Sequence, residues 1–186
     1  MFLSRPCNVS DYGLIYAGVQ KNVGPAGMVV VIIREDLIRD DLTNLPIYLQ
    51  YKTHADNDSL YNTPNCWAMY CCGKVFRYLL DMGGLEVMNQ KNIDKAKVMY
   101  DFLDQSKMFH GTVEKEYRSL MNVPFVTESA ELDAEVVAAT KKAGYDNLKG
   151  HKSVGGLRAS IYNAMPKEGV VALVEFLKKF EAEYKK

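Results

Sequence analysis

Two apolar runs close together in the sequence constrain the fold of this chain more than any other feature. Residues 12–18 (YGLIYAG) and 27–36 (GMVVVIIRED) are rich in β-branched and aromatic side chains, which favour strands. Their continuous apolar character predicts that both strands are buried. The link between them contains glycines, Pro25 and a single lysine, Lys21. We therefore expect a sheet near the start of the chain, with this link at its edge.

Helical patterns dominate the middle of the sequence. Residues 39–64 are polar and interrupted by prolines, so they predict a long loop. Thr63 as N-cap and Pro64 at the first helical position then predict a helix that ends at Gly83. A second helix is expected from residue 85 to about residue 105, with an apolar stripe on one face.

Shorter elements fill the last third of the sequence. Strands are expected within residues 118–126 (RSLMNVPFV) and 155–165 (GGLRASIYNAM). A helix is expected over residues 129–144 and an amphipathic helix over residues 166–186. This order of strands and helices predicts a small α+β domain from about residue 85 onward.

Composition excludes several classes of partner. The 186 residues include 23 Lys and Arg and 23 Asp and Glu, so the net charge is zero and no basic surface for nucleic acid or an anionic membrane is expected. The longest apolar run, residues 28–33, is too short to cross a bilayer. The first residues do not resemble a signal peptide, so a cytoplasmic location is expected. The cysteines lack C-x-x-C spacing and the histidines are far apart, so we expect no metal site.

Lys21 allows two interpretations. It is either a solvated loop lysine or an amine held out of water between two buried strands. No acidic residue lies between residues 17 and 28, and the glycines there allow close approach of another group. A lysine removed from water loses its proton more readily and becomes a nucleophile suited to a Schiff base. A phosphate-binding loop is excluded because the G-x-x-x-x-G-K-[ST] pattern is absent.

Four segments of the chain resemble one enzyme family. Residues 16–27 (YAGVQKNVGPAG) are similar to the cofactor-lysine segment of phosphoserine aminotransferases, which are class V members of the fold-type I pyridoxal-phosphate enzymes. Residues 59–70 (SLYNTPNCWAMY), 118–125 (RSLMNVPF) and 148–166 (LKGHKSVGGLRASIYNAMP) resemble further blocks of the same family. The resemblance extends from Leu3 to the C-terminal helix.

This resemblance implies an α/β fold in two parts. Residues 1–84 would be the C-terminal part of the large cofactor-binding domain of a fold-type I pyridoxal-phosphate transferase, and residues 85–186 a small α+β C-terminal domain. The family forms homodimers, so a homodimer is expected of the complete enzyme.

The resemblance also implies roles for four residues towards pyridoxal 5′-phosphate. Lys21 would hold the cofactor covalently and carry a proton between the substrate and the cofactor. Gln20 would form a hydrogen bond with the cofactor phosphate. Asn62 and Thr63 would reach the cofactor phosphate of the other subunit of the homodimer.

Three residues near the C-terminus would bind the substrate. Arg158 matches the arginine that binds the α-carboxylate, and a planar guanidinium suits that role because it donates two parallel hydrogen bonds. His151 and Lys152 match the His-Arg pair that binds the substrate phosphate; lysine here replaces the more common arginine. The implied reaction converts phosphoserine and 2-oxoglutarate into 3-phosphohydroxypyruvate and glutamate.

Two other hypotheses stay open at this point. The resemblance covers only about the C-terminal half of the family's length, so the chain could be an inactive fragment that folds as a C-terminal domain or serves as an interaction surface. A different class V enzyme, such as a serine–pyruvate aminotransferase or a cysteine desulfurase, is a third hypothesis. The phosphate-binding pair at His151 and Lys152 argues against it.

Overall fold

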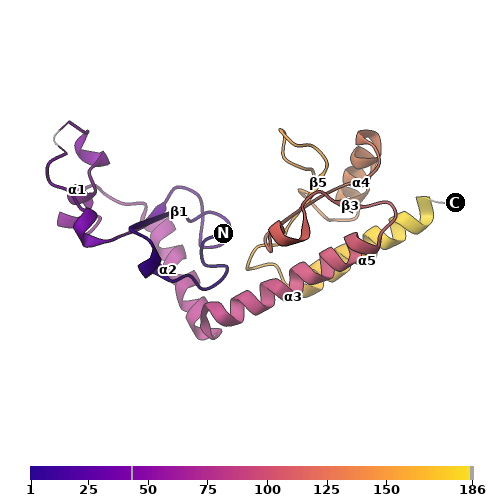
Figure 1. Ribbon diagram of the computed structural model, residues 1–186, viewed down its shortest axis with the longest axis horizontal. Helices are drawn as coiled ribbons and strands as arrows, with labels where there is room; N and C mark the ends of the chain where they lie inside the picture. Colours follow the sequence, from indigo (N-terminus) through magenta and orange to yellow (C-terminus); the bar gives the residue numbers. More distant parts are fainter. Residues whose placement is uncertain (43, 185–186) are drawn as a thin grey trace. The chain divides into compact units, whose positions relative to one another are not determined.

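The computed structural model describes residues 1–42 and 44–184 (Figure 1). The chain divides into two compact units, Met1–Glu86 and Val87–Lys186, here called unit 1 and unit 2. Thr43, in the predicted long loop, and residues 185–186, in the predicted terminal helix, lie outside the described residues.

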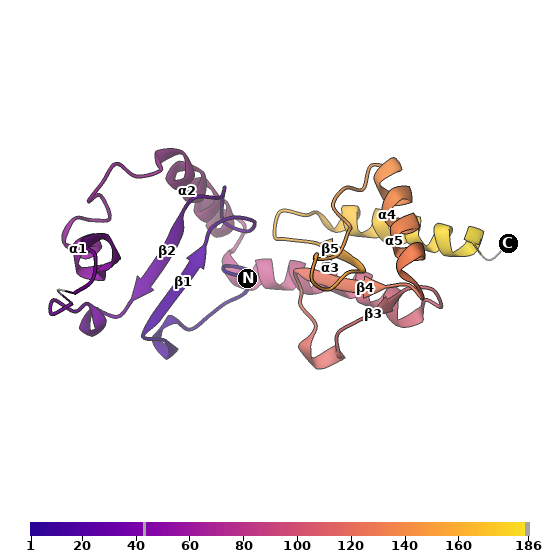
Figure 2. The same ribbon diagram turned by 90° about the horizontal axis from the view of Figure 1, so that it is seen from above.

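Unit 1 is built on a two-stranded antiparallel sheet. Strand β1 (Leu14–Gly18) pairs with β2 (Val29–Ile33), with Tyr16 opposite Val31 (Figure 2). The other elements are the 3-10 helices at Val9–Asp11, Glu35–Leu37 and Ile47–Leu49 and the helices α1 (Tyr51–Asp56) and α2 (Cys66–Asp81). The two predicted strands are confirmed.

The predicted burial of these strands is wrong for this chain. Tyr16 is 74% exposed and Val29 is 58% exposed. Val19, Val23 and Cys72 form a buried cluster in unit 1, and of the strand residues only the partly buried Val30 packs against it. An apolar composition shows that a strand is suited to burial on both faces, but its burial also requires other elements that pack against those faces.

Two further expectations for unit 1 need correction. The predicted long loop over residues 39–64 contains a 3-10 helix at Ile47–Leu49 and the six-residue helix α1, which is too short to give a clear periodic pattern. Helix α2 is capped by Asn65 rather than Thr63, because the Asn65 side chain accepts a hydrogen bond from the Ala68 N–H at 3.1 Å.

Unit 2 contains a three-stranded antiparallel sheet and three helices. The strand order is β3-β4-β5, formed by β3 (His110–Gly111), β4 (Asn122–Val126) and β5 (Leu157–Ser160). The helices are α3 (Gly84–Gln105), which begins at the end of unit 1, α4 (Ala130–Lys142) and α5 (Lys167–Tyr184), with a 3-10 helix at Lys115–Tyr117. Helices α3 and α5 run side by side in both views (Figure 1, Figure 2). The predicted helices and the strands β4 and β5 are confirmed, whereas β3 was not predicted.

One face of this sheet carries the core of unit 2. Val123 and Phe125 of β4 and Leu157 and Ala159 of β5 are buried against apolar side chains of the three helices. Because side chains alternate along a strand, Arg158 belongs to the opposite face of β5. The core therefore fixes β5 while leaving Arg158 outside the apolar cluster.

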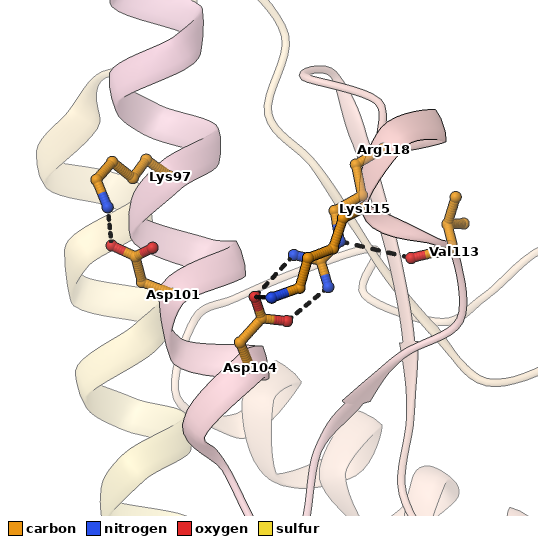
Figure 3. A network of polar contacts seen from close by, with 6 residues as sticks. All are labelled: Lys97, Asp101, Asp104, Val113, Lys115 and Arg118. Atoms are coloured by element: carbon orange, nitrogen blue, oxygen red, sulfur yellow. Dashed lines mark hydrogen bonds and ion pairs between the residues drawn. The ribbon is translucent and has the colours of Figure 1, made fainter.

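An ionic network ties α3 to the segment before β4 (Figure 3). The Asp104 carboxylate accepts hydrogen bonds from Arg118 and lies 3.0 Å from the Lys115 Nζ. Arg118 also lies over the Tyr100 ring, 4.5 Å from its centroid. The hydrogen bonds from Arg118 and then Lys115 lower the pKa of Asp104 from 3.8 to about 2.

Replacing Asp104 by asparagine is expected to destabilise the chain by about 0.5–1 kcal/mol at pH 7, a modest amount because solvent screens this partly exposed network. A carboxyl group whose pKa is lowered on folding stabilises the folded chain above its ordinary pKa of 3.8, and this contribution is lost as the pH falls through about 2. Urea unfolding at pH 7 and at pH 2 measures the difference. Asp101→Asn, which removes only the exposed pair with Lys97, is the matched control. An equal effect of the two substitutions at pH 7 would contradict the assigned role of the network.

Candidate functional site

Lys21 lies at the tip of a tight turn between β1 and β2. The Val23 and Gly24 N–H groups both donate to the Val19 carbonyl, at 3.0 and 2.9 Å. Val19 and Val23 are fully buried, whereas Lys21 is exposed. The turn therefore anchors its two valines in the core of unit 1 and holds the lysine outside it. Of the two interpretations of Lys21, the exposed side chain matches the solvated loop lysine in this chain.

The backbone at Lys21 is strained. Its φ angle is +86°, which is uncommon for a residue with a side chain and unfavourable for a long one. Strained conformations of this kind persist only where the surrounding structure fixes them, and they concentrate at functional sites. The buried valines on both sides provide that fixation here.

Helix α2 packs closely against the glycine-rich link. A Cβ atom placed on Gly24 would lie 2.7 Å from the Cys72 Sγ, so only glycine allows this approach. A Cβ atom on Gly27 would lie 3.0 Å from the Asn65 Nδ2, at the N-terminus of α2. The expected role of these glycines in close backbone approach is confirmed, and the neighbour they admit is α2.

The other predicted cofactor residues of unit 1 are exposed. Gln20 precedes Lys21 in the turn, and Asn62 and Thr63 lie in the segment that leads into α2. The Asn62 Nδ2 donates to the Thr63 carbonyl at 3.0 Å. Because Asn65 caps the helix, the Thr63 hydroxyl is not needed as a cap. The N-terminus of α2 still presents backbone N–H groups and the positive end of the helix dipole, which favour an anion.

Arg158 lies on β5 with its side chain half-buried. Its Nε is buried and has no hydrogen-bond partner among the described residues. The residue lines a pocket of about 390 Å³ between residues 145–148, strand β5 and the start of α5. A buried guanidinium N–H without an acceptor is unfavourable, so this geometry indicates a donor that is completed by a ligand.

His151 and Lys152 lie in a short loop that leads back into β5. The Gly150 N–H donates to the Gly156 carbonyl at 2.8 Å and closes this loop. The His151 Nδ1 lies 2.7 Å from the Ser153 Oγ, and both His151 and Lys152 are exposed. The loop therefore presents an imidazole and an ammonium group to solvent just before the strand that carries Arg158.

The seven predicted site residues fall into two groups. Unit 1 holds Gln20, Lys21, Asn62 and Thr63, the residues expected to bind the cofactor, and unit 2 holds those expected to bind the substrate: His151, Lys152 and Arg158. Within residues 1–42 and 44–184, no cluster of three or more His, Cys, Asp or Glu side chains is arranged to hold a metal ion. None of the helices that the structure describes is both long and apolar enough to span a membrane.

One residue of interest was not singled out in the sequence. Lys95 of α3 is buried and contacts the segment after β5. Its position in the sequence could have indicated this burial, because Lys95 lies at helical intervals from Met88 and Met99 and so belongs to the apolar stripe of the helix. A charged residue inside such a stripe indicates a specific polar contact.

Comparison with known proteins gives consistent matches over the chain. The family model for class V aminotransferases matches residues 1–173. The chain is 53% identical over 184 residues to phosphoserine aminotransferase 2, chloroplastic, of Arabidopsis thaliana, covering 98% of this chain and 44% of that protein. It is 53% identical over 181 residues to the phosphoserine aminotransferase of Histophilus somni, covering 97% of this chain and 51% of that protein.

Solved structures agree with these matches. The phosphoserine aminotransferase from Bacillus circulans subsp. alkalophilus superposes with a TM-score of 0.96 at 47% identity, over 98% of this chain and 51% of that one. The pyridoxal-phosphate-bound enzyme from Trichomonas vaginalis gives a TM-score of 0.90 at 41% identity, over 95% and 51%. The predicted α/β fold class is confirmed. The chain spans about half the length of the curated relatives that it matches.

Proposed function

Because this chain belongs to the class V aminotransferase family, we propose that it forms part of a phosphoserine aminotransferase, which exchanges an amino group between phosphoserine and 2-oxoglutarate. The observation that carries the proposal is Lys21, held at a φ of +86° on a turn fixed by buried valines. The names of the relatives supply the substrate class. Residues 1–84 would belong to a large cofactor-binding domain and residues 85–186 to a small domain.

The residues of unit 1 fit pyridoxal 5′-phosphate in their chemistry. The exposed Lys21 amine would hold the cofactor covalently, and Gln20 would donate a hydrogen bond to the phosphate. Asn62 and Thr63, beside the N-terminus of α2, would donate to the phosphate held by the other subunit of a homodimer. Bound pyridoxal phosphate would supply the electron sink for the reaction. The Lys21 amine would move the proton at the substrate α-carbon.

The residues of unit 2 suit a phosphorylated amino acid. The Arg158 guanidinium, whose buried Nε has no partner among the described residues, would bind the α-carboxylate. His151 and Lys152, exposed on the loop before β5, would bind the substrate phosphate. Lysine acts there as a point charge and lacks the fork of arginine, so we expect this contact to be less directional than in relatives that carry arginine.

Exposed apolar side chains in unit 1 favour contact with further polypeptide. Trp67 is 68% exposed, Tyr70 61% and Leu80 70%, all on α2. Trp67 and Tyr70 are three positions apart and therefore neighbours on α2, and exposed apolar side chains that gather in this way mark protein interfaces. We therefore propose that transamination requires further polypeptide that covers the exposed side chains of unit 1. The 186 residues alone would fold and serve as an interaction surface, with little activity. A homodimer and a cytoplasmic location are part of this proposal.

Replacing Lys152 by alanine tests the substrate class. The assay uses this chain joined to the N-terminal half of the Histophilus somni relative, here called the joined protein. We expect kcat/KM for phosphoserine to fall on the order of tenfold to a hundredfold, because one charge-assisted contact to phosphate is lost. The value for unphosphorylated serine should change less than about twofold. Lys149→Ala, an exposed lysine before the loop, is the control. Equal losses of kcat/KM for phosphoserine and for serine would contradict the phosphate-binding role of Lys152.

A further inference from the structure

Lys95 is a buried lysine in the middle of α3. Only 2% of the residue is exposed, and none of the ion pairs in the described part of the chain includes it. Burial lowers the pKa of Lys95 from 10.5 to about 8. Withdrawing an ammonium group from water is unfavourable unless its N–H groups have acceptors. The acceptors of Lys95 therefore indicate why the charge is retained in the core.

Helix α3 holds the chain directly after β5 through two polar side chains. The Lys95 Nζ donates to the Ile161 carbonyl at 3.2 Å and to the Tyr162 carbonyl at 2.7 Å. One helical turn earlier, the buried Asn92 donates from its Nδ2 to the Asn163 Oδ1 at 2.9 Å. Residues at this spacing lie on the same face of a helix. One face of α3 thus contacts three consecutive residues.

The same segment is fixed from the sheet. The Tyr162 hydroxyl and the Ser160 hydroxyl both donate to the Asn122 Oδ1 of β4, at 3.2 and 2.9 Å. Strand β5, which carries Arg158, is therefore held at its C-terminal end by β4 on one side and by α3 on the other. Lys95 is the charged member of this arrangement.

The residues that Lys95 holds also line the Arg158 pocket. Ile161 and Tyr162 belong to the lining of the 390 Å³ pocket together with Arg158. Any shift of these carbonyls moves the strand from which the guanidinium projects. We propose that Lys95 is a positioning residue that fixes the end of β5 and thereby the carboxylate-binding geometry of Arg158. The role of Arg158 in this inference rests on the proposed function. The fixation of β5 rests only on the contacts of Lys95.

Hydrogen exchange on the 186-residue chain tests the fixation of β5 directly. The Arg158 N–H donates to the Leu148 carbonyl at 2.7 Å and the Ile161 N–H to the Met121 carbonyl at 2.8 Å, so we expect both amides to exchange slowly in the unsubstituted chain. In Lys95→Met we expect both to exchange on the order of tenfold faster, with the amides of α4 unchanged. Lys95→Gln, which keeps an N–H donor, should give an intermediate rate. Lys97→Met, an exposed position on the same helix, is the control.

Kinetics of the joined protein test the link to Arg158. In Lys95→Met we expect KM for phosphoserine and for 2-oxoglutarate to rise on the order of fivefold to tenfold, with kcat within about twofold of the wild type. The reason is that Arg158 would bind the substrate carboxylate less well while the reacting groups stay in place. The positioning role of Lys95 would be overturned if amides exchanged faster throughout the chain. It would also be overturned if the amides of β5 exchanged no faster than in the wild type. Faster exchange in β5 with unchanged KM in an active protein would overturn the link to Arg158. An inactive joined wild type would refute the proposed function, and the exchange experiment would still decide the role of Lys95.

Discussion

Replacing Lys21 by alanine is expected to abolish transamination by the joined protein, with a loss of at least about a thousandfold, because the amine that holds the cofactor and moves the proton is removed. The visible absorption band of the lysine-bound cofactor should disappear in the same variant. Spectroscopy and steady-state kinetics measure the two effects independently. Lys74→Ala, an exposed lysine on α2, should leave both unchanged.

The strain at Lys21 sharpens this prediction. Glycine adopts a φ of +86° without strain, so Lys21→Gly should stabilise the 186-residue chain by about 1 kcal/mol while removing all activity from the joined protein. Urea unfolding measures the first effect. Lys21→Arg keeps the positive charge but not the nucleophilic amine, and it should be as inactive as alanine. A variant that lacks Lys21 and retains the absorption band would exclude this lysine as the covalent anchor.

The helices were predictable because their ends carry local signals. Ser129 caps α4 by accepting a hydrogen bond from the Leu132 N–H, and Gly144, with a φ of +91°, ends it. These contacts involve residues a few positions apart, so the sequence determines them almost alone. The cap of α2 was misplaced because Thr63 and Asn65 are both good capping residues and the choice depends on the local backbone.

Burial was less predictable than secondary structure. The exposure of Tyr16 depends on which elements cover the sheet, and that is a tertiary property which strand composition does not determine. The two-residue strand β3 has too few residues to show alternation. Family resemblance identified Lys21, but the strain in its backbone and its exposure became evident only in the structure. Lys95 was missed because a single lysine in an apolar stripe carries little weight in a periodicity argument.

Arg158 and Arg118 should respond to substitution in opposite ways. Arg158→Met is expected to lower kcat/KM of the joined protein for phosphoserine and for 2-oxoglutarate by about a hundredfold to a thousandfold, because a guanidinium–carboxylate contact is charge-assisted and bidentate. Its effect on unfolding of the 186-residue chain should be small, since the buried Nε loses no hydrogen bond to any residue that the structure describes. Arg158→Lys should recover little activity, because an ammonium group cannot reproduce the planar fork.

Arg118→Met is the matched control for this distinction. The Arg118 guanidinium is paired with Asp104 and lies over the Tyr100 ring, so its loss should destabilise the chain by about 1 kcal/mol. The kinetics of the joined protein should then stay close to those of the wild type. A structural role for Arg158 would give the same pattern as Arg118, with lower stability and unchanged KM. Loss of carboxylate binding at unchanged stability is the result expected of a ligand-binding arginine, because no described residue accepts a hydrogen bond from the Arg158 Nε and the substrate would supply the acceptor.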